Sequence, residues 1–318
     1  MNIVVIDGFT LNPGDLSWAG FEALGRCTVY PRSATEQVLE RCRDADVVLT
    51  NKVGFDDQLL SQLPKLKYLG VLATGYNVVD VAAATRREIA VTNVPGYGSQ
   101  SVAQFVFAQI LQWAQPVHYY ADTVKAKRWQ QSPDFCYYDH SMIELAGKTL
   151  GIIGYGAIGK KVAQIARGFD MQVLVHTRTP AQNLPEGVKA IDLDGLAKSA
   201  DIISLHCPLT ETNQRFINGD FLSAMKATAY LINTGRGGLI DEAALFDAID
   251  QRHIAGAALD VLSVEPPNAD HPLFQLERCV ITPHIAWATL EARSRLMAIA
   301  VDNLSAYLLN HYKNRLDK

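Results

Sequence analysis

The amino-acid sequence predicts an α/β protein made of two domains, each with a parallel sheet covered by helices. Short apolar segments typical of buried strands alternate with segments of helical spacing in both halves of the chain, and this alternation favours parallel sheets. The strand segments are almost continuously apolar, as strands buried on both faces are. A length of 318 residues is sufficient for about two domains.

The front part of the chain contains a first series of strands and helices. Apolar residues at helical spacing predict helices at Thr35–Arg43 and Val79–Glu88. The next segment, Ser99–Trp113, is apolar on nearly all sides and predicts a buried helix that lies between layers or domains. The predicted strands are Asn2–Ile6, Cys27–Tyr30, Asp46–Thr50, Tyr68–Ala73 and Val91–Asn93.

A second series of strands begins at Lys148. A final helix, from about Leu290 to Leu309, has no strand after it, so its pattern alone fits either domain. The predicted strands of this series are Thr149–Ile153, Gln172–His176, Ile202–His206, Tyr230–Asn233, Ala255–Leu259 and Val280–Thr282.

The segment between the two series, residues 126–141, is polar and rich in aromatic residues, with Trp129, Phe135, Tyr137 and Tyr138. Exposed aromatic side chains are enriched in subunit contacts. A loop packed on its own domain would have the same composition. Both interpretations stay open from the sequence.

Composition and charge argue against several function classes. The formal net charge is −4 and no run of Lys or Arg occurs, so nucleic acid is not expected as a partner. No apolar run reaches about 18 residues, so no membrane span is expected. The five cysteines are scattered without a CxxC pair, which favours reduced thiols in a cytoplasmic protein and predicts no metal site.

The strongest local motif is a glycine loop at residues 154–159, GYGAIG, between a predicted strand and a helix over Lys160–Arg167. Gly154 permits the tight turn, Gly156 lets the backbone approach a pyrophosphate, and Gly159 lets the helix pack closely on the strand. The N–H groups of the loop, which includes Ala157 and Ile158, and the positive end of the helix favour phosphates. The motif therefore predicts a dinucleotide site.

The end of the next strand is expected to lie beside the cofactor ribose. Proteins that prefer NAD usually carry Asp or Glu there, but the sequence at that point is His176-Thr177-Arg178. Arg178 would attract a 2′-phosphate and Thr177 would hydrogen-bond it. This pattern favours NADP(H). The alternative is that Arg178 stacks on the adenine and NAD(H) also binds.

Three polar residues, Arg236, Glu265 and His284, each follow a predicted strand of the second series. The carboxyl ends of parallel strands share one edge of a sheet, where ligands bind. We therefore expect these three side chains to converge, although they are far apart in the sequence.

This set of side chains suits the reduction of a 2-keto acid by hydride. The guanidinium of Arg236 would pair with the substrate carboxylate and polarise the adjacent carbonyl. The imidazolium of His284 would give its proton to the carbonyl oxygen. Glu265 behind the ring would orient it and stabilise its charged form. No metal is required for this chemistry.

These motifs resemble those of the D-isomer-specific 2-hydroxyacid dehydrogenases, over essentially the whole chain. NPGDLSW, LATGYNVVDV and SVAQFVF near the front are particularly similar to the bacterial glycerate dehydrogenases, also called hydroxypyruvate reductases. The other matching motifs are GYGAIG, HCPLT at His206–Thr210, NTGRGGLID at Asn233–Asp241, LDVLSVEP at Leu259–Pro266 and TPHIAW at Thr282–Trp287.

The resemblance implies roles for individual residues. Arg236 would bind the substrate carboxylate, and His284 would be the acid/base with Glu265 as its partner. The substrate side would be lined by Val53, Ala73, Thr74 and Gly75, with Arg236 and His284. The cofactor side would be lined by Val102, Cys207, Pro208, Thr212, Thr234, Gly235, Asp260 and Ala286, together with the glycine loop.

The resemblance also implies a discontinuous domain. Residues 1–98 with 287–318 would form a flavodoxin-like substrate-binding domain. Residues 99–286 would form a Rossmann-like dinucleotide-binding domain, with an active-site cleft between the two. A homodimer formed through the inserted domain is expected, which suits the aromatic segment 126–141.

Three functions are compatible with these residues. The first is a glycerate dehydrogenase or hydroxypyruvate (glyoxylate) reductase with a small 2-keto or 2-hydroxy acid as substrate. The second is a reductase of the same family for D-lactate or another 2-keto acid. The third is a dinucleotide-sensing, co-repressor-like binding protein, because such relatives can keep all three catalytic residues.

Overall fold

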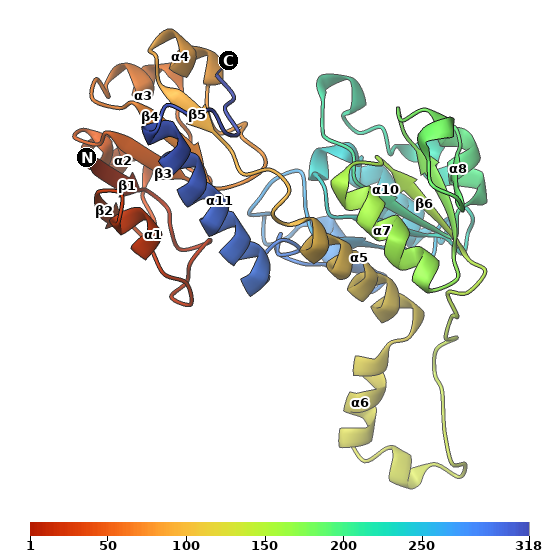
Figure 1. Cartoon of the computed structure of the whole chain (residues 1–318). Coiled ribbons are helices and arrows are strands. Elements are labelled where there is room, and N and C mark those ends of the chain that lie inside the picture. Colours follow the sequence, from red (N-terminus) through yellow and green to blue (C-terminus); the bar gives the residue numbers. More distant parts are fainter. Residues whose placement is uncertain (318) are drawn as a thin grey trace. The chain divides into compact units, whose positions relative to one another are not determined.

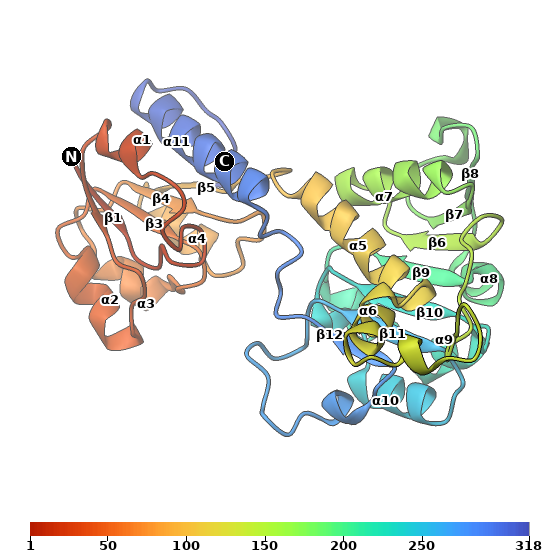
Figure 2. The same ribbon diagram turned by 90° about the horizontal axis from the view of Figure 1, so that it is seen from below.

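A computed structural model describes residues 1–317 of the chain (Figures 1 and 2). The chain forms two compact units. The first unit comprises residues 1–98 and the chain from Trp287 onwards, and the second unit comprises Ser99–Ala286. Each unit is built around one parallel sheet, so the predicted α/β class with two parallel sheets is confirmed.

The first unit has a five-stranded sheet in the order β2-β1-β3-β4-β5. All five strands that the sequence predicts are present, with ends that differ by one or two residues. Its strands are β1 (Asn2–Val5), β2 (Arg26–Val29), β3 (Val47–Thr50), β4 (Tyr68–Val71) and β5 (Ala90–Thr92).

Helices cover both faces of this sheet. Apolar residues of α2 (Thr35–Cys42), α3 (Asp57–Ser61) and α4 (Val81–Arg86) form one buried cluster with the strands. The opposite face packs against α1 (Ala19–Glu22) and α11 (Leu290–Leu308). The final helix, which has no strand after it, therefore belongs to the core of the first unit.

The C-terminal segment after α11 covers the outer edge of β5. The N–H of Leu316 donates to the carbonyl of Val91 at 2.9 Å, and the N–H of Val91 donates to the Asp317 carboxylate at 2.9 Å. The N–H of Asn93 donates to the carbonyl of Asn314 at 3.3 Å. Backbone groups of an edge strand that would otherwise be open to another chain are thus paired.

The second unit has a seven-stranded parallel sheet in the order β12-β11-β10-β9-β6-β7-β8. Strand β8 was not predicted, because it is only three residues long and has one buried side chain. The strands are β6 (Thr149–Ile153), β7 (Gln172–His176), β8 (Val188–Ala190), β9 (Ile202–Leu205), β10 (Tyr230–Asn233), β11 (Gly256–Leu259) and β12 (Cys279–Ile281).

Two helical layers enclose the second sheet. On one face lie α5 (Ser99–Ala114) and α7 (Ala157–Gly168), which pack side by side (Figure 1). The other face is covered by α8 (Leu193–Ser199), α9 (Gly219–Ala224) and α10 (Glu242–Asp250). Helix α7 begins three residues earlier than the sequence predicts, inside the glycine loop.

The expectation that α5 is buried on all sides was wrong. The helix itself is present, but Gln100, Gln104 and Leu111 are exposed, whereas Val106 and Ile110 are buried in the core of the second unit. The exposed residues recur at spacings of four and seven and therefore share one face. The high overall hydropathy of the segment concealed this exposed face, which carries two glutamines.

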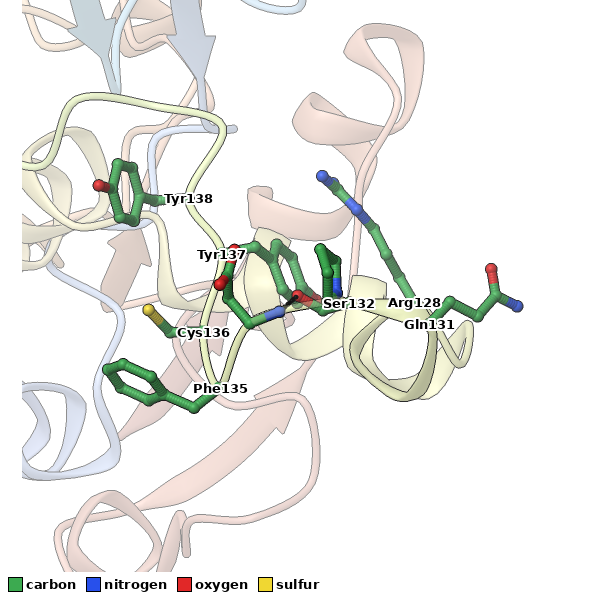
Figure 3. Close-up of a pocket in the computed structure, with 9 residues that line it drawn as sticks. Arg128, Gln131, Ser132, Phe135, Cys136, Tyr137 and Tyr138 are labelled. Carbon is green, nitrogen blue, oxygen red and sulfur yellow. Dashed lines mark hydrogen bonds between the residues drawn. The ribbon is translucent and has the colours of Figure 1, made fainter.

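An arm extends from the second unit between α5 and β6 (Figure 1). It consists of α6 (Val117–Lys125), a 3₁₀ turn at Trp129–Gln131 and a return segment without regular structure. Helix α6 buries none of its residues, and Phe135 and Tyr138 are 89% and 73% exposed. Figure 3 shows these two rings pointing away from the turn that carries Arg128. The aromatic segment therefore does not pack as a loop on its own sheet.

Within residues 1–317, no helix combines the length and the apolar character that crossing a membrane requires. All five cysteines are free thiols.

Candidate active site

The glycine loop joins β6 to α7, and its three glycines meet different surroundings. Gly154 has a φ of +99°, and a Cβ placed on it would lie 2.5 Å from the backbone N of Cys207. A Cβ on Gly159 would lie 2.2 Å from the carbonyl oxygen of Gly154. A Cβ on Gly156 would meet no atom within 4 Å. Close packing therefore requires Gly154 and Gly159, while Gly156 leaves open space in front of the helix, where a phosphate would fit.

The end of β7 lies beside this loop, because the N–H of Gly154 donates to the carbonyl of His176 at 3.0 Å. The Thr177 hydroxyl accepts the N–H of Thr179 at 3.1 Å, which shapes the turn after the strand. Arg178 is exposed, and its guanidinium makes no hydrogen bond or ion pair with any residue that the structure describes. The ribose-side turn therefore presents a cation and no carboxylate.

Strand β9 ends next to β6 at His206 and Cys207. The N–H of His206 donates to the carbonyl of Ile153 at 2.7 Å, and its Nε2 lies 2.9 Å from the Ser204 hydroxyl. Burial lowers the pKa of His206 to about 4 and raises the pKa of the Cys207 thiol. Both side chains are therefore neutral near pH 7 and contribute no charge beside the phosphate region.

Two further residues predicted for the cofactor side follow this strand. Pro208 and Thr212 are both exposed. The Thr212 hydroxyl lies 3.1 Å from that of Thr210, in a 3₁₀ turn over Glu211–Asn213.

Strand β10 ends in a turn that carries Arg236. The side chain of Asn233, which is fully buried, accepts the N–H of Gly235 at 2.9 Å and donates to the carbonyl of Arg236 at 2.8 Å. Arg236 is exposed and donates through Nη1 to the Gly235 carbonyl at 2.8 Å, which leaves its other N–H donors available. Asn233 was not among the predicted site residues, although an Asn two residues before a Gly at a strand end is typical of such turns.

The Thr234 hydroxyl is buried and has no hydrogen-bond partner among residues 1–317. A buried polar atom without a partner is costly in a folded protein. This unpaired hydroxyl lies at the carboxyl edge of a parallel sheet, as does the open space at Gly156. Both features are compatible with a dinucleotide bound at this edge.

Asp260, at the end of β11, holds the loop that follows β12. Its buried carboxylate accepts the Thr282 hydroxyl at 2.7 Å and the N–H groups of Ile285 and Ala286 at 2.9 and 2.8 Å. His284 lies inside this loop with a φ of +55°, a region that non-glycine residues rarely adopt. Three of the hydrogen bonds that Asp260 accepts therefore serve to shape the backbone around His284.

The Ala286 carbonyl accepts the Ser101 hydroxyl at 2.6 Å, which connects this loop to the first turn of α5. Val102, the neighbouring residue that was predicted for the cofactor side, is buried.

The imidazole of His284 lies against the carboxylate of Glu265. Nδ1 of His284 is 2.6 Å from Oε2 of Glu265, and both side chains are partly exposed. The other oxygen of Glu265 accepts the N–H of Leu262 at 3.1 Å. The structure thus brings together two of the three residues predicted for catalysis. The pairing of Nδ1 with a carboxylate directs Nε2 to the opposite side, where it would meet a substrate.

Gly237, which the sequence analysis did not single out, connects the Arg236 turn with the loop that carries Glu265. A Cβ on Gly237 would lie 1.9 Å from the backbone carbon of Leu262 and 2.3 Å from the N of Ser263. The two backbones therefore touch directly. This signal could not be found in the sequence, because only the tertiary packing shows which glycine faces another segment.

The substrate-side residues predicted in the first unit lie on loops after β3 and β4. Asp7 accepts the backbone N–H groups of Asn51, Lys52 and Val53 at 2.8, 2.6 and 3.1 Å. Val53 also lines a pocket of about 980 Å³ in this unit. Asp7 therefore shapes the loop that carries Val53, a role that the sequence analysis did not foresee.

The loop over Ala73, Thr74 and Gly75 is held from β5. The Ala73 carbonyl accepts the N–H of Val94 at 2.9 Å, and the Thr74 carbonyl accepts the Asn93 amide at 2.8 Å. The N–H groups of Thr74 and Gly75 hydrogen-bond to no part of the chain that the structure describes. They are thus available donors on a loop.

Comparison with known proteins agrees with this arrangement. The model of the D-isomer specific 2-hydroxyacid dehydrogenase NAD binding domain matches residues 107–286. The chain is 43% identical, over the full length of both proteins, to a hydroxypyruvate reductase of Blautia hydrogenotrophica. These matches show that the second unit contains an NAD(P)-binding domain.

Solved structures with the same fold are also oxidoreductases. An acyclic imino acid reductase in complex with NADPH and D-Arg is 31% identical, with a TM-score of 0.85 over 99% of this chain and 100% of that one. An NADPH-dependent glyoxylate/hydroxypyruvate reductase of Sinorhizobium meliloti, in complex with NADP and malonate, is 28% identical. Its TM-score is 0.83 over 99% of this chain and 96% of that chain. The family model and the full-length relative together show that this chain belongs to the D-isomer specific 2-hydroxyacid dehydrogenases and is an oxidoreductase that acts on a CH–OH group.

Proposed function

We propose that the protein reduces hydroxypyruvate, and also glyoxylate, with NADPH as the preferred cofactor. The observation that carries this proposal is the His284–Glu265 pair at 2.6 Å, at the same sheet edge as Arg236. The hydroxypyruvate reductase that is 43% identical over its full length supports the choice of substrate. Oxidation of D-glycerate is the reverse reaction.

The residues of this chain would divide the reaction as follows. Arg236 would pair with the substrate carboxylate through its available N–H donors and polarise the carbonyl. When bound, the reduced nicotinamide supplies the hydride for C2 of the keto acid. His284 would release the proton on Nε2 to the carbonyl oxygen, while Glu265 holds Nδ1 and stabilises the charged ring. The amide donors of Thr74 and Gly75, and the loop at Val53, are proposed as further substrate contacts.

The cofactor would be held by the second unit. Gly156, with Ala157 and Ile158 at the start of α7, would accept the pyrophosphate, and the orphan hydroxyl of Thr234 would gain a hydrogen-bond partner. The preference for NADPH rests on Arg178, which is exposed and makes no ion pair with any described residue. The turn that carries it contains no carboxylate, so a 2′-phosphate would meet a cation and no repelling charge. The two related structures with NADPH or NADP support it.

The arm is proposed to form a homodimer. Phe135, Tyr138 and Met142 are all more than half exposed, and α6 buries none of its side chains. An apolar surface of this kind on a protruding segment marks a protein–protein contact.

A steady-state screen tests the function. Hydroxypyruvate, glyoxylate and pyruvate are each offered with NADPH and with NADH, and hydroxypyruvate with NADPH is expected to give the highest kcat/KM. His284→Ala is expected to lower kcat about 10²–10⁴-fold, because the proton donor is lost. His253→Ala, a change of an exposed histidine outside the site, serves as the matched control. The absence of turnover with every acid would favour a dinucleotide-binding protein without this activity.

A further inference from the structure

A second carboxylate, that of Glu242, lies behind the loop that carries Glu265. Oε1 of Glu242 accepts the N–H of Ser263 at 2.6 Å, and Oε2 accepts the Ser263 hydroxyl at 2.7 Å. Nε2 of His271 lies 3.3 Å from the same Oε2. The Glu242 side chain is only 18% exposed, so both of its oxygens are engaged in a partly buried site. Charge-assisted hydrogen bonds of this kind are short and strong.

These contacts hold the loop that contains Glu265. Ser263 stands two positions before Glu265, and the N–H of Leu262 donates to Oε1 of Glu265 at 3.1 Å. The other oxygen, Oε2, is the one that meets His284. A two-point attachment of Ser263 therefore fixes the backbone on which the orientation of the Glu265 carboxylate depends.

The local structure of α10 does not require this use of Glu242. Asp241 is the N-cap of α10, and its carboxylate already accepts the N–H groups of Ala243 and Ala244. The side chain of Glu242, at the first helical position, reaches across to a loop 21 residues further along the chain. The contact therefore serves the loop more than the helix.

We propose that Glu242 is a positioning residue, which acts through Ser263 to hold Glu265 in the orientation that directs His284 toward the substrate. The proposal rests on the proposed function of the Glu265–His284 pair. A misplacement of about 1 Å in such a pair costs on the order of 10²-fold in rate. Without Glu242, the 262–265 loop would lose both attachments at Ser263, and Glu265 would sample other orientations.

The test uses the full chain with four variants. Glu242→Ala is expected to lower kcat about 10- to 100-fold, with a change in KM below about threefold. Glu242→Gln is expected to restore most of kcat, because its amide can still accept from the Ser263 N–H and donate to the hydroxyl. Ser263→Ala, which keeps the backbone contact, is expected to fall between the two. Glu277→Ala, at an exposed carboxylate outside this loop, is the matched control and is expected to match the wild type.

A double-mutant cycle separates positioning from a general loss of structure. If Glu242 acts through Glu265, then Glu242→Ala combined with Glu265→Ala has nearly the kcat of Glu265→Ala alone. Losses that multiply in the double variant would overturn the proposal. If Glu242→Ala does not fold, Ser263→Ala takes its place in the cycle, with Glu242→Gln as the conservative comparison.

A spectroscopic measurement does not depend on turnover. In protein labelled with ¹⁵N-histidine, the Nδ1 signal of His284, assigned by its loss in His284→Ala, is expected to move in Glu242→Ala toward its position in Glu265→Ala. An unchanged signal would overturn the positioning role, whatever the activity. A wild-type protein without turnover, but with the expected shift, would refute the proposed function and leave the positioning role standing.

Discussion

The contact at Gly237 allows a sharp test of how the active-site loops are built. A Cβ at this position would lie 1.9 Å from the carbonyl carbon of Leu262, where ordinary contact begins near 3.4 Å. The Gly237→Ala substitution therefore has to separate the two backbones by about 1.5 Å. Because neither atom is the end of a flexible side chain, the Arg236 turn and the loop of Glu265 must move apart.

Gly237→Ala is expected to lower both the rate of catalysis and the stability of the second unit. A displacement of more than 1 Å in a catalytic arrangement costs on the order of 10²-fold in rate, so kcat in Gly237→Ala is expected to fall about 100-fold or more. Overpacking costs about 1–3 kcal/mol. In a unit of this size each kcal/mol lowers Tm by about 2–4 °C. The variant should therefore still be folded at 25 °C.

Steady-state kinetics and thermal unfolding, measured on the same preparation, check this expectation. Gly219→Ala is the matched control, because a Cβ there meets no atom within 4 Å, and its kcat and Tm should stay close to those of the wild type. A folded Gly237→Ala with normal kcat would refute the reasoning, since it would mean that the relative position of Arg236 and Glu265 is unimportant.

Four further expectations follow from the structure. Thr177→Asp combined with Arg178→Ala should lower the ratio of kcat/KM for NADPH over NADH by about 10- to 100-fold, because repulsion would replace the charge-assisted contact proposed between Arg178 and the 2′-phosphate. An unchanged ratio would place the discrimination elsewhere. Because the pKa of His206 is lowered to about 4 in the folded protein, this histidine binds a proton in the unfolded chain but not in the folded one between about pH 6.5 and pH 4. The free energy of unfolding should thus fall by up to roughly 3 kcal/mol as the pH drops through that window, and urea titrations should show a smaller loss in His206→Gln. Deletion of the chain from Asn314 onwards removes three hydrogen bonds to the β5 edge, and should cost about 2–3 kcal/mol in urea titrations and promote aggregation seen by light scattering. Phe135→Asp should convert the proposed dimer to a monomer in sedimentation, and an unchanged Tm measured at low concentration would exclude a folding defect as the cause.

Much of the fold could be read from local patterns. Strands such as Val47–Thr50 and Tyr230–Asn233 are short, fully buried and mostly apolar, because a parallel sheet buries both of its faces. The same approach failed for β8, where three residues with one buried side chain leave no pattern. It also overestimated the burial of α5, since overall hydropathy does not show on which face Gln104 lies.

By itself, the sequence determined the classes of residue at the strand ends: a glycine loop at 154–159, a cation at Arg178 and the polar residues Arg236, Glu265 and His284. These are local motifs, and the shared edge of parallel strands predicts that they meet. Only the tertiary structure decided how they are held. The clamp of Glu242 on Ser263 and the backbone contact of Gly237 with Leu262 join segments 20 or more residues apart. Such contacts depend on the path of the chain in space, which no local spacing encodes.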